Sequence, residues 1–141
     1  MSKITAYHGK PELKAEIVAD MRLYIDAGCL GQSAYWDGES GCLVGCTLDA
    51  QGVARAGMGE KESHDLYANI SGFPPKMIFV IDRLFTALPE KECQNFCIAV
   101  LEAIRPNADL EHVVSEWLTG VVEGGEYVNN PSLKIPKGRR A

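Results

Sequence analysis

The feature that most constrains the fold is a series of apolar stripes at helical spacing. In residues 75–88, apolar side chains recur every three or four positions and form a wide stripe. Pro89 interrupts this stripe, and a second one follows in residues 93–104. The same spacing occurs in residues 11–27, where Pro11 suits the first turn of a helix because a missing N–H costs nothing there. The chain therefore predicts successive amphipathic helices rather than strands.

Two more segments, residues 60–70 and 110–122, repeat the helical spacing. The connections between the last three predicted helices are short, which favours antiparallel packing of neighbours. We therefore predict an all-α fold, a single-domain bundle of five or six helices within residues 1–125. A Gly-rich segment, residues 28–59, is expected to lie over one end of the bundle. Residues 126–141 are predicted to form a basic, flexible C-terminal tail.

The charge of the chain restricts its partners. The formal net charge is −5 at pH 7, although residues 126–141 contain four basic residues and only one acid. Affinity for duplexes comes largely from neutralised phosphates, so the acidic body disfavours nucleic-acid binding. Only the basic tail suits an anionic partner.

The composition also indicates a compartment. No apolar run approaches the roughly 20 residues of a membrane-spanning helix, so we expect no membrane association. The N-terminus lacks the apolar centre of a signal peptide, which predicts a cytoplasmic location. The chain has five cysteines, an odd number, and no export signal, so the thiols are expected to be reduced.

Residues 32–48, QSAYWDGESGCLVGCTL, form the most distinctive stretch of the chain. They lie within residues 28–59, which hold eight of the fourteen glycines and are therefore expected to be rich in loops. Ser40 suits the cap of a short helix in residues 41–50. A hairpin around residues 37–38 is the alternative.

Tyr35 and Trp36 form an aromatic pair inside this stretch. Such a pair on a loop brings a large apolar area to a ligand or a protein partner at little cost in conformational entropy. The same pair also suits a structural plug at the end of the bundle, because tryptophan is usually well buried. Both interpretations remain open from the sequence.

Cys42 and Cys46 give the stretch its chemical interest. If the helix begins at residue 41, Cys42 lies in its first turn, where the positive end of the helix dipole favours the thiolate. His8 or His64 as a base would then complete a cysteine nucleophile. Against this, most free cysteines pack as small buried hydrophobes.

The same four side chains offer a zinc site, since zinc takes four Cys or His ligands, or three and a water. The CxxxC spacing differs from the two-residue spacing of a zinc knuckle. Cys93 and Cys97 repeat this spacing, but they lie on an apolar stripe and are expected to pack in the core. Asp82 lies in the most apolar predicted helix and would need a partner if buried.

Several strings of residues match a known pattern. They include AYHG at residues 6–9, WxGxxGCxVGCTL at residues 36–48 and HxxY at residues 64–67. With these, the chain resembles a family of small bacterial and phage-borne proteins that share the GCxVGCTL motif. The chain departs from the family pattern at Tyr24, where a histidine is expected, and in a longer insert around residues 50–61. The family has no known activity, so the resemblance implies no catalytic role.

Two classes of function follow. The first is a small cytoplasmic binding or regulatory protein that docks on another protein or a small ligand through the Gly-rich loop. The resemblance is also compatible with a phage-borne protein of this class. The second is a small Cys/His-dependent enzyme or zinc-binding protein, with zinc as the only cofactor implied. We favour the first, because the sequence names no complete catalytic set. The candidate site residues are Tyr35, Trp36, Cys42, Cys46, His8 and His64.

Overall fold

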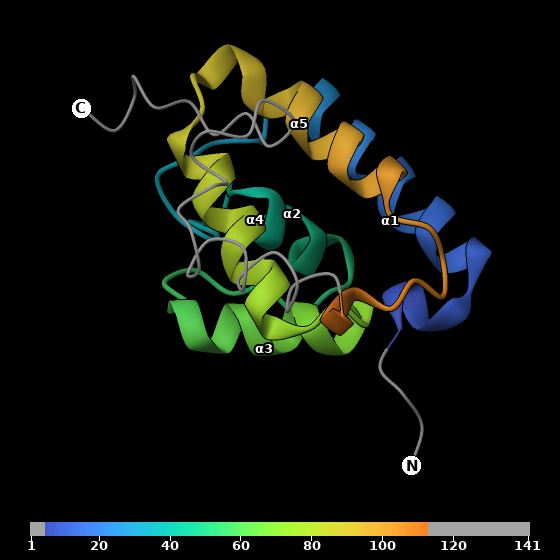
Figure 1. The fold of residues 1–141 in the computed structure, drawn as a ribbon. Helices are drawn as coiled ribbons and strands as arrows, with labels where there is room; N and C mark the ends of the chain where they lie inside the picture. Colours follow the sequence, from blue (N-terminus) through green and yellow to red (C-terminus); the bar gives the residue numbers. More distant parts are fainter. Residues whose placement is uncertain (1–4, 113–141) are drawn as a thin grey trace, which may run out of the picture.

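The computed structural model describes residues 5–112 of the chain. In this part the fold is all-α, with five α-helices and one short helical turn (Figure 1), which confirms the predicted fold class. The predicted helix at residues 110–122 lies outside the described part from residue 113 onward, as do the boundary at residue 125 and the basic tail. The elements are η1 (Ala6–Gly9), α1 (Pro11–Asp26), α2 (Leu43–Ala50), α3 (Glu60–Ser71), α4 (Pro75–Ala87) and α5 (Glu90–Ala103).

Glycine and proline set the bounds of these helices. Gly72 ends α3 in the left-handed conformation, with φ of 76°, which glycine adopts without steric cost. Pro11 and Pro75 occupy the first turns of α1 and α4, as their fixed φ favours. Pro89 separates α4 from α5, because a proline inside a helix would clash with the preceding turn.

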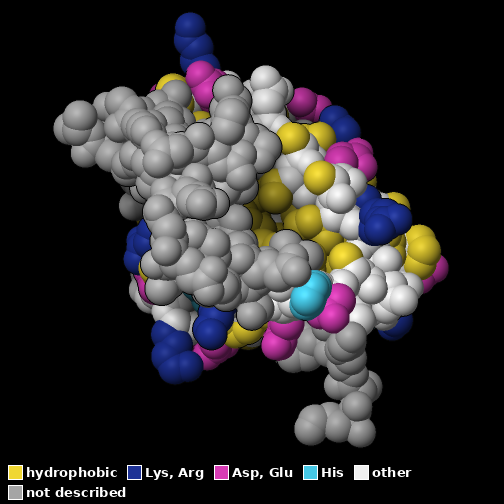
Figure 2. Space-filling model, in the orientation of Figure 1, with side chains coloured by type: hydrophobic (Ala, Val, Ile, Leu, Met, Phe, Trp, Pro, Cys, Tyr) yellow, Lys and Arg dark blue, Asp and Glu magenta, His cyan; other side chains and the backbone are white. Residues whose placement is uncertain are grey.

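The core forms around α2, the shortest α-helix. Its residues 43–48 are all buried, and α2 contacts α1, α3 and α4. A helix that is buried on every side is typical of a protein interior. The long helices α1 and α5 pack side by side (Figure 1). In the same orientation, hydrophobic side chains gather near the centre of the face, with charged side chains of both signs around them (Figure 2).

The N-terminal turn η1 is part of the core. Tyr7 is fully buried, and its hydroxyl donates a hydrogen bond to the carbonyl of Leu101 at 2.7 Å. The backbone of Ala6 exchanges hydrogen bonds with Asn107 and Ala108. Tyr7 has a positive φ of 53°, a conformation that costs about 1–2 kcal/mol for a residue other than glycine. Burial of the Tyr7 ring offsets this cost.

The Gly-rich segment differs in part from its prediction. Helix α2 begins at Leu43, two residues later than expected, and Cys42 rather than Ser40 occupies the capping position. Ser40 instead closes a tight turn in which the Asp37 carboxylate accepts hydrogen bonds from the backbone N–H of Glu39 and Ser40, both at 2.8 Å. This turn leads to an isolated antiparallel bridge between residues 36 and 41. A turn of the hairpin kind therefore precedes a short helix.

Within residues 5–112, no helix is long and apolar enough to cross a membrane. All five cysteines have free thiols, as expected from the sequence. The predicted burial of the second CxxxC pair is also confirmed. Cys93 is 2% exposed and Cys97 is fully buried.

Candidate functional site

The two glycines of the GCxVGC string allow the chain to pack closely against α2. A Cβ atom at Gly45 would lie 1.4 Å from the carbonyl oxygen of Tyr35, and one at Gly41 would lie 2.0 Å from the same oxygen. No side chain fits at either position. These glycines are thus required for a close approach of two backbones, with Tyr35 and Trp36 placed directly on the helix.

Trp36 is held on this surface from several sides. Its ring meets the ring of Tyr24 edge-on, with centroids 6.2 Å apart, and only 8% of the residue is exposed. The backbone carbonyl of Trp36 accepts a hydrogen bond from the N–H of Gly57 at 3.2 Å. Trp36 therefore anchors the loop in the core, as the plug interpretation predicts.

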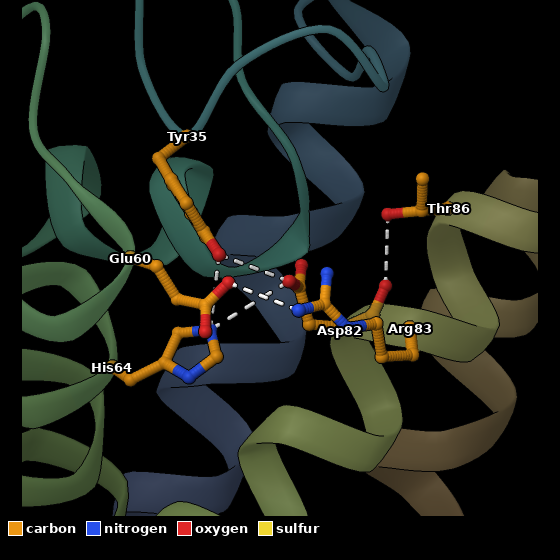
Figure 3. A network of polar contacts seen from close by, with 6 residues as sticks. All are labelled: Tyr35, Glu60, His64, Asp82, Arg83 and Thr86. Atoms are coloured by element: carbon orange, nitrogen blue, oxygen red, sulfur yellow. Dashed lines mark hydrogen bonds and ion pairs between the residues drawn. The ribbon is translucent and has the colours of Figure 1, made fainter.

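Tyr35 joins two buried polar side chains from different helices (Figure 3). Its hydroxyl donates a hydrogen bond to Oδ2 of Asp82 on α4 at 3.0 Å. Nε2 of His64 on α3 lies 3.2 Å from the same hydroxyl and 3.6 Å from Oδ2 of Asp82. Because the Tyr35 hydroxyl gives its only proton to Asp82, Nε2 of His64 is the donor to the hydroxyl oxygen. Asp82 thus has the partners that its burial requires.

A pocket of ≈ 570 Å³ lies beside this network. Its walls come from residues 32–37, from residues 56–58 with Glu60, from Cys42, and from one side of α4 around residues 82–86. This volume falls within the range of about 300–1,000 Å³ that is usual for small-molecule sites. Its lining combines apolar side chains, such as those of Trp36 and Met58, with several polar and charged ones.

The structure brings several of the predicted site residues together. Tyr35, Trp36 and Cys42 line the pocket. His64 lies next to it and contacts Tyr35. The burial of Trp36 agrees with the structural interpretation of the pair, and its role toward a ligand or partner stays a prediction. Trp36 is largely buried, whereas the hydroxyl of Tyr35 belongs to the polar network.

The two remaining candidates lie elsewhere. Cys46 is 1% exposed, and its Sγ donates to the backbone carbonyl of Gly41 at 3.3 Å. His8 donates from Nε2 to the backbone carbonyl of Asn69 at 2.8 Å, near the C-terminal end of α3. Neither side chain lines the pocket.

The thiols do not carry the reactivity that a helix N-terminus was expected to confer. Burial raises the pKa of Cys42 to about 12, although backbone N–H groups of the first turn of α2 act in the opposite direction. Burial also raises the pKa of Cys46 to about 12, and the neighbouring Cys42 adds to the effect. The prediction of a stabilised thiolate is therefore wrong, because loss of solvation outweighs the helix dipole.

The zinc set is likewise not assembled. In the described part of the chain, which includes all four proposed ligands, no group of three or more His, Cys, Asp or Glu side chains could hold a metal ion. Zinc needs its ligands within about 2.0–2.3 Å of one point. His8 and Cys46 are instead engaged by backbone carbonyls in separate places.

Sequence reasoning missed several residues of the site. The pocket is also lined by Glu60, Arg83 and Thr86. Glu60 forms an ion pair with Arg83 at 3.3 Å. Gln32 fixes the start of the loop, because its amide Nε2 donates to the carbonyl of Phe85 at 2.9 Å. The one indication available was Asp82, a lone carboxylate on an apolar stripe. It was expected to need a partner if buried, and the structure gives it Tyr35 and His64.

Comparison of the chain with protein-family models, curated proteins and solved structures finds no match. The resemblance carried by the GCxVGCTL string therefore stays a prediction. In this chain the string has a structural role, since its glycines seat Tyr35 and Trp36 against α2. The function has to be argued from the pocket that this packing creates.

Proposed function

We propose that the chain is a small cytoplasmic binding protein whose ligand is a small molecule held in the pocket beside Tyr35. The observation that carries this proposal is the pocket of ≈ 570 Å³, which three of the sequence-predicted residues line. Pockets that combine apolar walls with few convergent polar groups are the usual sites of small ligands. Tyr35 and Asp82 line the pocket and supply such groups here, and His64 contacts Tyr35 beside it.

The walls of the pocket are held in place before any ligand binds. Gln32 ties the loop to the end of α4, and the N–H of Gly57 ties a second loop to Trp36. Gly45 lets the backbone of Tyr35 rest on α2 without a gap. A preformed pocket loses little conformational entropy on binding, which favours affinity for a small molecule.

Small-molecule binding is better supported than docking on a protein. Hot spots of protein interfaces are commonly Trp or Tyr side chains that a partner can bury. Trp36 is already 92% buried by its own chain, because only 8% of it is exposed. It therefore lacks the exposed area that a protein hot spot needs, although it still contributes to the wall of the pocket.

Binding is also better supported than cysteine catalysis. Cys42 lines the pocket, but burial keeps its thiol protonated at neutral pH by raising its pKa to about 12. Burial also raises the pKa of the Tyr35 hydroxyl far above its ordinary value, and the Asp82 carboxylate acts in the same direction. Nucleophiles need a lowered pKa or an adjacent base that accepts their proton. Neither side chain meets the first condition.

A ligand-observed NMR screen of a small-molecule library against the full chain tests the proposal. Thr86 is exposed on α4 and lines the pocket, so Thr86→Trp fills the cavity from a position that tolerates a large side chain. Lys76 is exposed on the same helix outside the pocket, and Lys76→Trp is the matched control. We expect hits that Thr86→Trp abolishes and Lys76→Trp retains. A library without hits, or hits that both variants bind equally, would overturn the proposal.

A further inference from the structure

The charged groups that line the pocket are mostly acidic. Among residues 5–112, Asp37, Glu60 and Asp82 contribute three carboxylates to the lining, against one guanidinium, that of Arg83. The Arg83 charge is engaged by Glu60 at 3.3 Å, and its guanidinium lies over the ring of Phe79, 4.4 Å from the centroid. The described lining therefore has a formal excess of two negative charges and little free positive charge to receive an anion.

Asp82 offers the pocket an acceptor that is almost completely buried. The residue is 7% exposed, and both of its side-chain contacts, with Tyr35 and with His64, are made by Oδ2 (Figure 3). Among the described residues, no hydrogen bond reaches Oδ1. This oxygen is also not among the side-chain atoms that are both completely buried and without a hydrogen-bond partner. An ionised carboxylate accepts at both oxygens. Because Asp82 lines the pocket, Oδ1 is the oxygen that we assign to the donor of a ligand.

Aromatic and apolar side chains complete the pocket. Trp36 and Tyr35 line it together with Met58, which is itself 6% exposed. A buried carboxylate beside aromatic walls is the combination that recognises an organic ammonium group, because the charge is paired and the hydrocarbon part is covered.

We propose that the ligand of this pocket is a small organic cation, a primary ammonium compound with an apolar body. Its ammonium group donates a hydrogen bond to Oδ1 of Asp82, and its apolar body lies against Trp36 and Met58. This inference rests on the proposed function, since it names the chemical class of ligand for the same pocket. Glu60 at the rim attracts the same charge, and Arg83 opposes it.

Three probes of nearly identical shape test the charge preference directly. Benzylammonium, benzyl alcohol and benzoate share one ring and carry a positive, a neutral and a negative group. Titration of the full chain at low ionic strength, followed by protein-observed NMR, gives an affinity for each probe. We expect benzylammonium to bind about tenfold or more tightly than benzyl alcohol, as for hydrogen bonds to a charged group. We expect benzoate to bind least.

Two variants at the rim separate electrostatics from structure. Glu60 and Arg83 form one exposed ion pair, so Glu60→Gln and Arg83→Gln break the same contact. If the pair acts only structurally, both variants change the affinity for benzylammonium in the same direction. We expect opposite directions, with weaker binding by Glu60→Gln and tighter binding by Arg83→Gln. Asp65→Asn serves as the control, because Asp65 is exposed, pairs with Lys61 and does not line the pocket.

Asp82→Asn completes the set. It should weaken the binding of benzylammonium about tenfold or more while changing that of benzyl alcohol little. Because this variant also alters the contacts of Tyr35 and His64, the rim variants keep the inference testable if Asp82→Asn does not fold.

Each outcome decides a separate point. Equal affinity for benzylammonium and benzyl alcohol, both lost in Thr86→Trp, would overturn the cation inference and leave the binding function intact. Tightest binding of benzoate, or equal effects of the two rim variants, would also overturn it. If no probe binds and the library yields only neutral or anionic hits in the pocket, the inference again fails. A chain that binds no small molecule at all would refute the proposed function as well.

Discussion

Gly45→Ala is the most informative single change in this chain, because it adds one methyl group where two backbones meet. The new Cβ atom would lie 1.4 Å from the carbonyl oxygen of Tyr35 and 2.4 Å from its carbonyl carbon. Real Cβ contacts do not fall below 3.0 Å. The loop must therefore move outward by about 1.6 Å, since neither a backbone carbonyl nor a helix can yield by rotating a side chain.

The expected cost follows from two opposing effects. Overpacking of this kind costs about 1–3 kcal/mol, and somewhat more where the clash is with backbone. Alanine is a better helix former than glycine by about 1 kcal/mol, which offsets part of this cost inside α2. We expect a net loss of about 2 kcal/mol in the free energy of unfolding. For a chain of this size, that corresponds to a fall of roughly 6–10 °C in Tm.

Urea unfolding of the wild type and the variant, followed by circular dichroism, measures this loss. Gly59→Ala is the matched control, because a Cβ at Gly59 meets no atom within 4 Å and φ there is −84°. Because Gly59 is the N-cap of α3, where alanine is less favourable than glycine, the control should lose at most about 1 kcal/mol, well below the loss expected at Gly45. If Gly45→Ala equals the control or exceeds the wild type in stability, the close approach of Tyr35 to α2 is refuted.

Three further predictions concern single side chains. Burial raises the pKa of Cys42 and Cys46 to about 12. The contribution of these protonated thiols to stability is therefore fully present below the unfolded pKa of about 9, and it is lost as the pH rises toward 12. Between pH 7 and pH 10 we expect each of the two thiols to lower the free energy of unfolding, measured in urea, by about 1 kcal/mol. The Cys42→Ala, Cys46→Ala double variant should lose correspondingly less over the same range. Parallel pH profiles of the wild type and this variant would contradict the prediction. Ser63→Ala should stabilise the fold by about 1 kcal/mol, because the buried Ser63 hydroxyl has no hydrogen-bond partner within residues 5–112, and a thermal shift downward would argue against it. Tyr35→Phe should destabilise the fold by about 1–3 kcal/mol in chemical denaturation, because the buried Asp82 loses a hydrogen bond; an unchanged midpoint would show that this bond contributes nothing.

The helices could be predicted because their pattern is local. The stripe in residues 75–88 and the prolines beside it are visible within one window of sequence, and α4 matches them closely. The burial of Cys93 and Cys97 followed from the same stripe. Such predictions need no knowledge of which helix packs against which.

The site could not be predicted in the same way, because its contacts join distant parts of the chain. Tyr35 and Asp82 are 47 positions apart, and no local pattern indicates that they meet. The glycines of residues 28–59 suggested a segment rich in loops, whereas the structure requires Gly41 and Gly45 for contact with the backbone of Tyr35. The position of Cys42 near the start of a helix suggested a reactive thiol. The pKa of this thiol depends instead on burial by residues from other segments. Composition identified the stretch that matters, and tertiary packing decided its role.

The N-terminal turn has a consequence for the timing of folding during synthesis. Tyr7 is made early, yet its hydroxyl bonds to Leu101, 94 positions later. At typical rates of about 5–20 residues per second, the ribosome needs roughly 5–20 s to cover that distance. During this interval the Tyr7 ring can pack only against earlier residues such as Phe73, its hydroxyl lacks the acceptor at Leu101, and α1 lacks α5 as its neighbour. The core around the N-terminal turn is therefore complete only after residues 101–108 have emerged from the ribosome.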